Sequence, residues 1–134
     1  MKQIGVGVIA LGWMGRLHSR GFRQVAERYP ELGVDARLVA AADPVPANRE
    51  AARGLGFERA VEDYREVLAD PQIEAVSICA PNFLHHEIAM AAVGAGKHFW
   101  IEKPMGVNAA QSREIAQAAA AAGLVTAAGF NYRH

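Results

Sequence analysis

Apolar stretches of strand length alternate with helical patterns along almost the whole chain. The apolar stretches cover residues 3–9, 37–42, 57–60 (the weakest), 75–80, 98–102 and 124–130. The helical patterns cover residues 14–28, 47–53, 64–69, 85–93 and 109–122. The stronger stretches are apolar almost throughout, which is typical of strands covered on both faces. The alternation therefore predicts βαβ units and a parallel sheet with right-handed crossovers.

Capping residues support these boundaries. Asn108 followed by Gln111 resembles a capping box that opens the last helix, and Gly123 stands where a C-terminal cap is expected. Gly94 and Gly96 are expected to end the preceding helix in the same way. Neither a repeat nor a linker interrupts the pattern, so residues 1–134 are expected to form one domain.

Composition narrows the class of protein. Of 134 residues, 51% are hydrophobic and 21% are charged, as in soluble globular domains. Fourteen basic and fourteen acidic residues cancel and are mixed along the chain, so neither a nucleic-acid nor a membrane partner is expected. Cys79 is the one cysteine, which excludes an internal disulfide and favours a cytoplasmic protein. We expect it to be a small core residue.

The segment GVGVIALGWMG offers two registers for one phosphate-binding turn of the G-x-G-x-x-G/A type. The first begins at Gly5 and ends at Ala10, and the second begins at Ala10 and continues through Gly12 to Gly15. A phosphate turn must follow a strand and open a helix, because the helix N-terminus supplies free amides and the positive end of the dipole. Gly5 and Gly7 fall inside the first strand, so the second register is predicted.

This register places alanine where the fingerprint has its first glycine. Ala10 fits without strain if its φ is negative, whereas a positive φ costs ~1 kcal/mol or more. Trp13 and Met14 follow Gly12 in the turn. Trp13 either covers the cofactor from this turn or only packs within an exposed loop.

Asp43 follows the second strand, where a carboxylate can accept hydrogen bonds from the adenosine ribose. Its separation from Gly12 exceeds the usual ~20 residues, which fits a surface excursion around residues 30–35. The alternative is that Asp43-Pro44 only starts a turn. A ribose-binding Asp43 favours NAD over NADP, and Arg49 can reverse that preference by pairing with a 2′-phosphate.

Residues 75–105, AVSICAPNFLHHEIAMAAVGAGKHFWIEKPM, carry the most specific pattern in the chain. Here the sequence resembles the glucose–fructose oxidoreductase/inositol dehydrogenase (Gfo/Idh/MocA) family. The resemblance rests on the glycine turn, Pro81-Asn82 with His85, Glu102-Lys103-Pro104, and the closing Asn131-Tyr132-Arg133. It runs across the whole chain, and Ala10 is the one evident departure.

The resemblance implies an α/β fold, a doubly wound parallel (Rossmann) sheet of about six strands in the order 3-2-1-4-5-6 with helices on both faces. It implies hydride exchange between NAD or NADP and a carbinol or carbonyl carbon of a sugar, cyclitol or similar polyol. It also implies that Lys103 lies beside the nicotinamide and substrate, that Pro104 often follows a cis bond, and that Asn82 and His85 line the cofactor groove. Alternatively, Lys103 is a solvated charge paired with Glu102, and His85 caps or packs a helix.

The candidate site thus comprises one catalytic residue, Lys103, and a set of cofactor-binding residues. That set is Ala10, Gly12, Trp13, Met14, Gly15, Asp43, Pro81, Asn82, His85, Glu102, Lys103, Pro104 and Asn131. An ammonium at Lys103 can stabilise a developing alkoxide, or share a proton if burial lowers its pKa. No metal site is expected.

Two functions from different classes remain open at this point. One is the cofactor-binding half of an NAD(P)-dependent oxidoreductase, inactive alone. For this function the family resemblance implies that a second, substrate-binding and dimerising domain, with an Asp and a His of a D-x-x-x-H pattern, would follow. The other is a non-catalytic nucleotide-binding module, for which Lys103 has no evident use. A methyltransferase-like fold gives no role to Glu102-Lys103-Pro104. Exposure of the surface that would dock a second domain predicts self-association.

Overall fold

The computed structural model describes residues 1–133 and contains a six-stranded parallel sheet in the order β3-β2-β1-β4-β5-β6. The strands are β1 (Lys2–Ile9), β2 (Val34–Ala42), β3 (Arg59–Val61), β4 (Ala75–Ile78), β5 (His98–Glu102) and β6 (Thr126–Gly129). All five strand pairs are parallel. The predicted doubly wound α/β fold and its strand order are confirmed.

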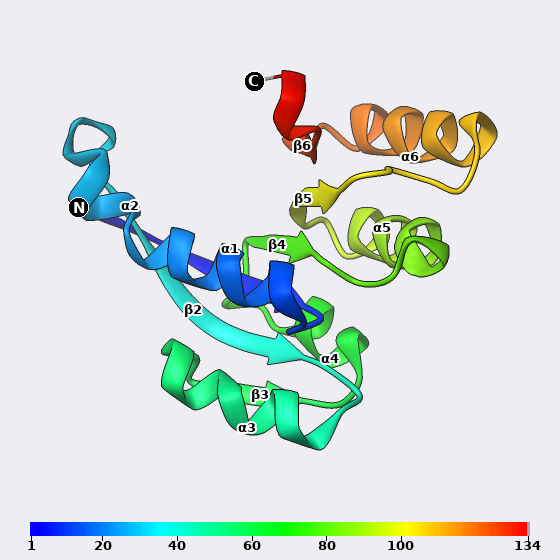
Figure 1. Cartoon of the computed structure of the whole chain (residues 1–134). Coiled ribbons are helices and arrows are strands. Elements are labelled where there is room, and N and C mark those ends of the chain that lie inside the picture. The colour runs from blue at the N-terminus through cyan, green and yellow to red at the C-terminus, as the bar shows by residue number, and fades with distance from the viewer. Residues whose placement is uncertain (134) are drawn as a thin grey trace.

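Helices cover both faces of the sheet (Figure 1). One face carries α1 (Trp13–Arg23), α2 (Val25–Arg28) and α3 (Pro46–Leu55), and the other carries α4 (Tyr64–Ala69), α5 (His85–Gly94) and α6 (Ala109–Ala121). Short 3₁₀ turns lie at Pro30–Leu32, Asn82–Leu84 and Asn131–Arg133. Within residues 1–133, no helix combines the length and apolar character that a membrane crossing requires.

Two apolar clusters, one on each face, hold these layers together. The larger lies under α4, α5 and α6, with Ile78, Ile88 and Ile115 almost completely buried. The smaller lies under α1 and α3, with Val8 and Leu11 fully buried. Because both faces are covered, the central strands are apolar nearly throughout, as the sequence pattern predicts.

Most predicted elements differ from the observed ones by one to three residues at an end, and the differences at α1, β2 and β6 have a structural basis. The helix expected over 14–28 is interrupted at Gln24, whose N–H donates to the Gly21 carbonyl in a tight turn and separates α1 from α2. Strand β2 begins at Val34 rather than at residue 37, because polar Asp35 and half-buried residues extend its pairing with β1 beyond the apolar run. Strand β6 is shorter than predicted, Thr126–Gly129.

The predicted helix caps are largely confirmed. Asn108 accepts the Gln111 N–H at 2.9 Å, although the Gln111 side chain accepts from Val107 N–H and not from Asn108. Gly96 and Gly123 have positive φ directly after α5 and α6, and the backbone bonds there form the Schellman pattern. Gly94, in contrast, is the last residue of α5 and is not part of this cap.

The two glycines inside β1 serve packing, not phosphate binding. A Cβ on Gly5 would overlap the carbonyl oxygen of Gln72, in the loop before β4. A Cβ on Gly7 would lie 2.5 Å from Val67 Cγ1 in α4. Both residues pair with β2. The first of the two registers is therefore excluded by the position of its glycines within a buried strand.

Replacement of Gly5 by alanine is expected to lower the free energy of unfolding by about 2 kcal/mol or more, because the added methyl meets fixed backbone rather than a movable side chain. Gly54→Ala is the matched control. Gly54 lies in α3 with no heavy atom within 4 Å of the point that an added methyl would take, so this change should stabilise by about 0.5–1 kcal/mol. Urea unfolding measures both, and equal effects of the two substitutions would contradict this account of Gly5.

Candidate cofactor and active site

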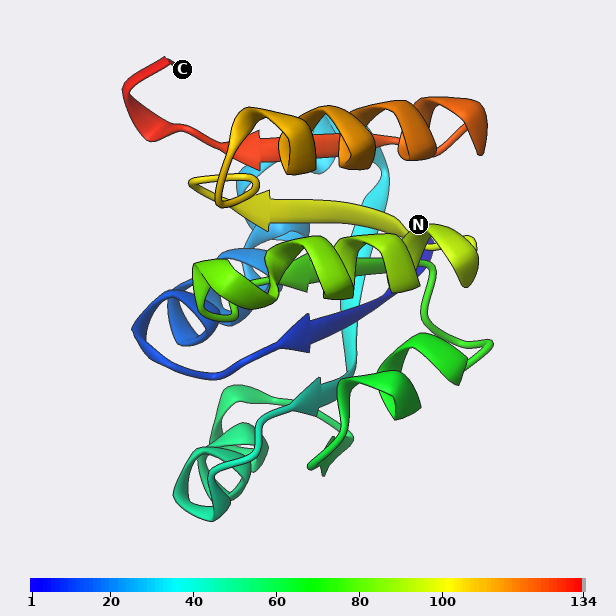
Figure 2. The ribbon, with the colours of Figure 1, turned by 90° about the vertical axis from the view of Figure 1, so that its right-hand side faces the viewer.

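The candidate residues follow the carboxyl ends of several strands. In a parallel sheet these ends share one edge, where ligands of open α/β folds bind. Figure 2 shows the arrowheads of β1, β4, β5 and β6 directed to the same side, with the turn after β1 on that side. Segments far apart in sequence, after residues 9, 42, 78, 102 and 129, thus meet along this edge.

The turn after β1 has the strained geometry considered for Ala10. Its φ is +76°, and it is the single non-glycine residue of the described chain with positive φ. The Ala10 N–H donates to the Ala42 carbonyl at 2.7 Å, which holds the turn against β2. A Cβ on Gly15 would overlap the carbonyl oxygen of Ala10, so α1 packs here directly on the end of β1. The second register therefore has the close helix–strand contact that its last glycine permits.

Gly12 leaves open space at the N-terminus of α1. It is the N-cap of the helix, with φ −68° and no side-chain cap, and the first turn of α1 has no acidic residue. No heavy atom lies within 4 Å of the position of an added Cβ. Free backbone amides, the positive end of a helix dipole and an open approach are the features that accommodate a diphosphate. The residues present fit this part of a dinucleotide.

The carboxylate of Asp43 braces the same turn. One of its oxygens accepts the Leu11 N–H at 2.8 Å and the Asn48 amide at 3.2 Å, while the other accepts the Val45 N–H at 2.8 Å. Asp43 is only 4% exposed. A carboxylate offers about four acceptor positions, and three are used within the protein. Asp43 is therefore a structural link between the β1 and β2 loops, with limited capacity left for a ribose.

Two arginines reinforce this link. Arg16 Nε donates to the Leu11 carbonyl at 3.0 Å, and its Nη2 donates to Asn48 Oδ1 at 2.9 Å. Arg49 Nη1 donates to the carbonyls of Asp43 and Pro44, both at 3.0 Å. The Arg49 guanidinium is thus held by the backbone of the β2–α3 loop.

The segment after β4 contains one buried polar atom that lacks a partner and one buried histidine that has two. Asn82 Oδ1 is the single buried side-chain acceptor without a hydrogen bond within the described chain. His85 is 1% exposed, with Nδ1 2.8 Å from the Pro104 carbonyl oxygen and Nε2 2.8 Å from that of Ala80. His85 therefore links the loop after β4 to the loop after β5. This contact agrees with the alternative that His85 packs rather than binds the cofactor. Pro104 follows the expected cis bond.

A cleft of about 720 Å³ opens between α1 and the ends of β4, β5 and β6. Its lining residues are Trp13, Met14, Leu17, His18, Cys79, Ala80, Trp100, Glu102, Lys103, Gly129 and Asn131. Five predicted site residues are brought together here: Trp13, Met14, Glu102, Lys103 and Asn131. The remaining candidates do not line the cleft. They lie in the turn after β1, or in the segments that follow β2, β4 and β5: Ala10, Gly12, Gly15, Asp43, Pro81, Asn82, His85 and Pro104.

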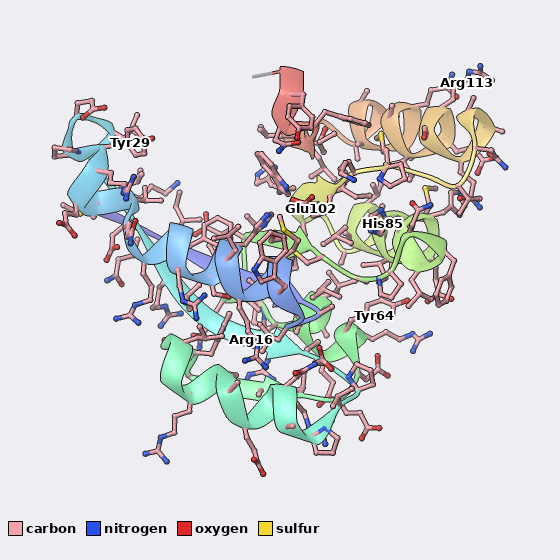
Figure 3. All side chains as sticks on the ribbon, viewed as in Figure 1. Arg16, Tyr29, Tyr64, His85, Glu102 and Arg113 are labelled. Carbon is pink, nitrogen blue, oxygen red and sulfur yellow. The ribbon has the colours of Figure 1, made fainter. Side chains whose placement is uncertain are left out.

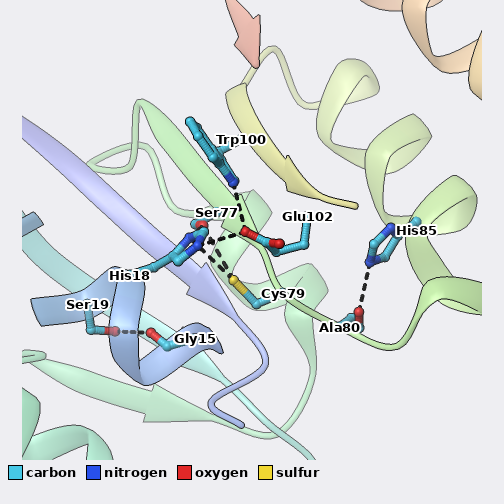
Figure 4. Close-up of polar contacts among 9 residues, drawn as sticks. All are labelled: Gly15, His18, Ser19, Ser77, Cys79, Ala80, His85, Trp100 and Glu102. Atoms are coloured by element: carbon cyan, nitrogen blue, oxygen red, sulfur yellow. Dashed lines mark hydrogen bonds and ion pairs between the residues drawn. The ribbon is translucent and has the colours of Figure 1, made fainter. Parts of the chain in front are cut away.

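A network of polar contacts centred on Glu102 forms part of the wall of this cleft. Glu102 lies on the α1 side of β5, whereas His85 is the first residue of α5, on the other face of the sheet (Figure 3). His18 Nε2 lies 2.9 Å from Glu102 Oε1, and its Nδ1 lies 2.6 Å from the hydroxyl of Ser77 (Figure 4). Trp100 Nε1 donates to the same Glu102 oxygen at 3.2 Å. Glu102 is therefore engaged by His18 and Trp100.

Burial determines the protonation of two groups in the network. Desolvation lowers the pKa of His18 from its ordinary value of 6.5, against the opposing attraction of Glu102. Desolvation also raises the pKa of the Cys79 thiol to about 12, and the nearby Glu102 charge adds to this rise. A thiol with this pKa is neutral at physiological pH and is a poor nucleophile. Cys79 thus lines the cleft without being a reactive group.

Sequence reasoning missed His18, Leu17 and Trp100. One signal for His18 was present, because positions 14 and 18 are four residues apart on the predicted helix and hence share a face. Nothing in the sequence paired His18 with Glu102, since that contact depends on how α1 lies over β5. Within residues 1–133, no group of three or more His, Cys, Asp or Glu side chains is placed to hold a metal ion.

Comparison with known proteins gives a match over residues 4–130 to the model of the GFO_IDH_MocA oxidoreductase family, NAD-binding Rossmann fold. The chain is 39% identical to levoglucosan dehydrogenase of Pseudarthrobacter phenanthrenivorans over 99% of its length, and 32% identical to myo-inositol 2-dehydrogenase of Thermotoga maritima over 96%. These matches cover 34% and 36% of the two relatives.

The fold is also similar to that of solved structures. A levoglucosan dehydrogenase complexed with NADH superimposes with a TM-score of 0.92 at 35% identity, over 98% of this chain and 36% of the other. The chain thus spans about a third of the length of the relatives that it matches. The likeness extends over the whole sheet and the edge that carries the candidate site.

The strain at Ala10 predicts that Ala10→Gly stabilises the protein. Relief of a positive φ gains about 1–2 kcal/mol, and the more flexible unfolded chain offsets about 0.4–1 kcal/mol of that gain. Ala116→Gly, at an exposed position inside α6, is the matched control and should destabilise by about 1 kcal/mol. Chemical denaturation should therefore give shifts of opposite sign for the two alanines, and a loss of stability in both would contradict the strained geometry.

The lowered pKa of His18 predicts a stability that falls on acidification. Folding favours the neutral imidazole, so its contribution is complete above pH 6.5 and is lost as the pH falls through the folded-state pKa. The free energy of unfolding of the wild type should therefore decrease relative to that of His18→Gln between pH 7.5 and pH 5, by at most about 1.4 kcal/mol per pH unit. A difference that is constant over this range would show that His18 is not held neutral.

Proposed function

The chain belongs to the Gfo/Idh/MocA oxidoreductase family with its NAD-binding Rossmann fold, and from this membership we propose that it is the cofactor-binding part of a sugar or cyclitol dehydrogenase. The observation that carries the proposal is the position of Lys103. It lines a cleft at the end of β5, on the same sheet edge as the open helix N-terminus at Gly12. A site of this kind needs both a diphosphate-binding turn and a polar group near the reacting carbon.

We propose that the dinucleotide lies along this edge with its adenosine toward Asp43 and its nicotinamide in the cleft. The amides at the start of α1 would hold the diphosphate, and the strained turn at Ala10 would keep them at the edge. Asn82 Oδ1, the buried acceptor without a partner, supports a ligand donor near the end of β4. When bound, the nicotinamide supplies or accepts the hydride.

Lys103 is proposed as the group that acts on the substrate hydroxyl. It is exposed, lines the cleft and directly follows Glu102, whose carboxylate contacts His18. An ammonium there can donate a hydrogen bond to the substrate oxygen and stabilise the negative charge that develops on it. The apolar side chains of Trp13, Met14 and Leu17 would exclude water from one side of this position.

We propose a preference for NAD over NADP. A buried carboxylate at the end of β2 places negative charge where a 2′-phosphate would lie. The Arg49 Nη1 already donates to two backbone carbonyls, which restrains its guanidinium from pairing with such a phosphate. Because three acceptor positions of Asp43 are in use, its effect on the ribose would be as much electrostatic as through direct hydrogen bonds.

The substrate class is proposed from the relatives, whose names specify levoglucosan and myo-inositol, both polyols. Lys103 and Asn131 line the cleft and are exposed. The remaining walls of a substrate pocket would come from a further part of the whole protein. The alternative of a non-catalytic nucleotide-binding module leaves Lys103 in the cleft without a use. The oxidoreductase proposal gives it one.

Titration of the chain with NADH, followed by nicotinamide fluorescence, is expected to show saturable binding that Gly12→Asp weakens at least tenfold. The new carboxylate would occupy the diphosphate position with like charge. It would not disturb folding, because the position is open and an acid at a helix N-terminus is favourable. NADPH should bind at least tenfold more weakly than NADH.

Gly94→Asp is the control for added charge, since Gly94 lies at the C-terminal end of α5 with open space around it. It should bind NADH like the wild type. Absence of NADH binding by the folded wild type would overturn the proposed function, and an NADPH affinity equal to that for NADH would overturn the proposed cofactor preference alone.

A further inference from the structure

We propose that His18 is a positioning residue of the nicotinamide end of the cleft, acting through Glu102 on the turn that begins at Lys103. The inference rests on the proposed function, because it assumes that the nicotinamide occupies this cleft. It assigns a role to a polar residue of α1, whose other cleft-lining residues, Trp13, Met14 and Leu17, are apolar.

The direction of the hydrogen bonds of His18 follows from their partners. A carboxylate only accepts, so His18 Nε2 carries a proton and donates to Glu102 Oε1. Burial favours the neutral imidazole, so Nδ1 is an acceptor, and the hydroxyl of the fully buried Ser77 donates a hydrogen bond to it. Cys79 Sγ lies 3.5 Å from Nδ1, as a neutral thiol. His18 is thereby held in one tautomer that presents an N–H to Glu102.

Three elements converge on the Glu102 carboxylate. His18 of α1 and Trp100 of β5 both donate to Oε1. A Cβ on Gly129 of β6 would lie 2.8 Å from the same oxygen, so this glycine leaves the carboxylate its space. The ring of His18 also contacts that of Trp100 edge-on, with centroids 5.8 Å apart. These contacts from α1, β5 and β6 restrain the Glu102 side chain in the wall of the cleft.

Stability alone gives little reason for this arrangement. A buried carboxylate loses hydration, and apolar residues of similar size are often as stabilising as a buried polar pair. The side chains of His18 and Glu102 are 14% and 13% exposed, and both residues line the cleft. The pair thus places a fixed negative charge one residue before the Lys103 ammonium, at the surface that would contact the nicotinamide.

A second histidine–glutamate pair provides the contrast. His86 Nε2 lies 2.7 Å from Glu114 Oε2, between α5 and α6, with side-chain exposures of 29% and 61%. Neither residue lines the cleft, and the pair joins two helices on the other face of the sheet. The His86–Glu114 pair resembles the His18–Glu102 pair in its chemical groups and its N–O distance, but it lies away from the cleft. His86 is therefore the matched control for His18.

The test compares NADH with ADP-ribose, which contains the adenosine and diphosphate but lacks nicotinamide. His18→Phe keeps an aromatic ring, somewhat larger than imidazole, and removes the N–H donor. It should weaken NADH binding about tenfold or more while changing ADP-ribose affinity less than about twofold. His18→Gln offers an amide N–H in place of Nε2 and should restore NADH affinity to within about threefold of wild type. His86→Phe should bind both ligands like the wild type.

Each outcome separates this inference from the proposed function. Wild-type protein that binds neither ligand overturns the proposed function itself. Equal weakening of NADH and ADP-ribose by His18→Phe, or unchanged binding of both, overturns the positioning role. If His18→Phe does not fold, the ¹⁵N resonances of His18 in the wild type decide: NADH should shift the Nε2 signal and ADP-ribose should not. An identical response to the two ligands would overturn the inference.

Discussion

The contact of α1 with the end of β1 is the constraint on which the rest of the site depends. Because Gly15 has no side chain, the helix packs directly on the Ala10 carbonyl and begins at the edge of the sheet. That close approach has two consequences. The open N-terminus of α1 at Gly12 lies along the edge of the sheet. About one turn further along the helix, His18 lies over β4 and β5 and contacts Ser77 and Glu102. One steric fact therefore positions both halves of the site.

A carboxylate is fixed at each end of this sheet edge, buried at Asp43 and partly buried at Glu102. Asp43 is held by backbone amides of Leu11 and Val45, which belong to loops and do not titrate. Glu102 is held by side-chain donors of His18 and Trp100 from separate elements. The first arrangement makes the turn rigid, as a phosphate site made of backbone requires. The contacts of Glu102 depend on the distance between α1 and β5, so they change if the helix shifts on the sheet.

The sequence was sufficient for the fold, because alternation of strands and helices, apolar strands and capping residues are local patterns. The choice of Gly12 and Gly15 over Gly5 and Gly7 also followed from local order along the chain. The bracing role of Asp43 and the burial of His85 did not, since both depend on carbonyls and amides brought together by packing. His18 was missed for the same reason, as its partners Ser77 and Glu102 lie on other strands, far along the chain.

The strain at Ala10 bears on why this edge is suited to a ligand. A positive φ in a non-glycine residue persists only where the surroundings impose it. Here they do so through the Ala10 amide on Ala42, the Ala10 carbonyl under Gly15, and the neighbouring Leu11 amide on Asp43. The same contacts leave the space beside Gly12 empty. The turn is thus held by these contacts and is open at Gly12, where the proposed diphosphate would lie, so binding would require little reorganisation of the protein.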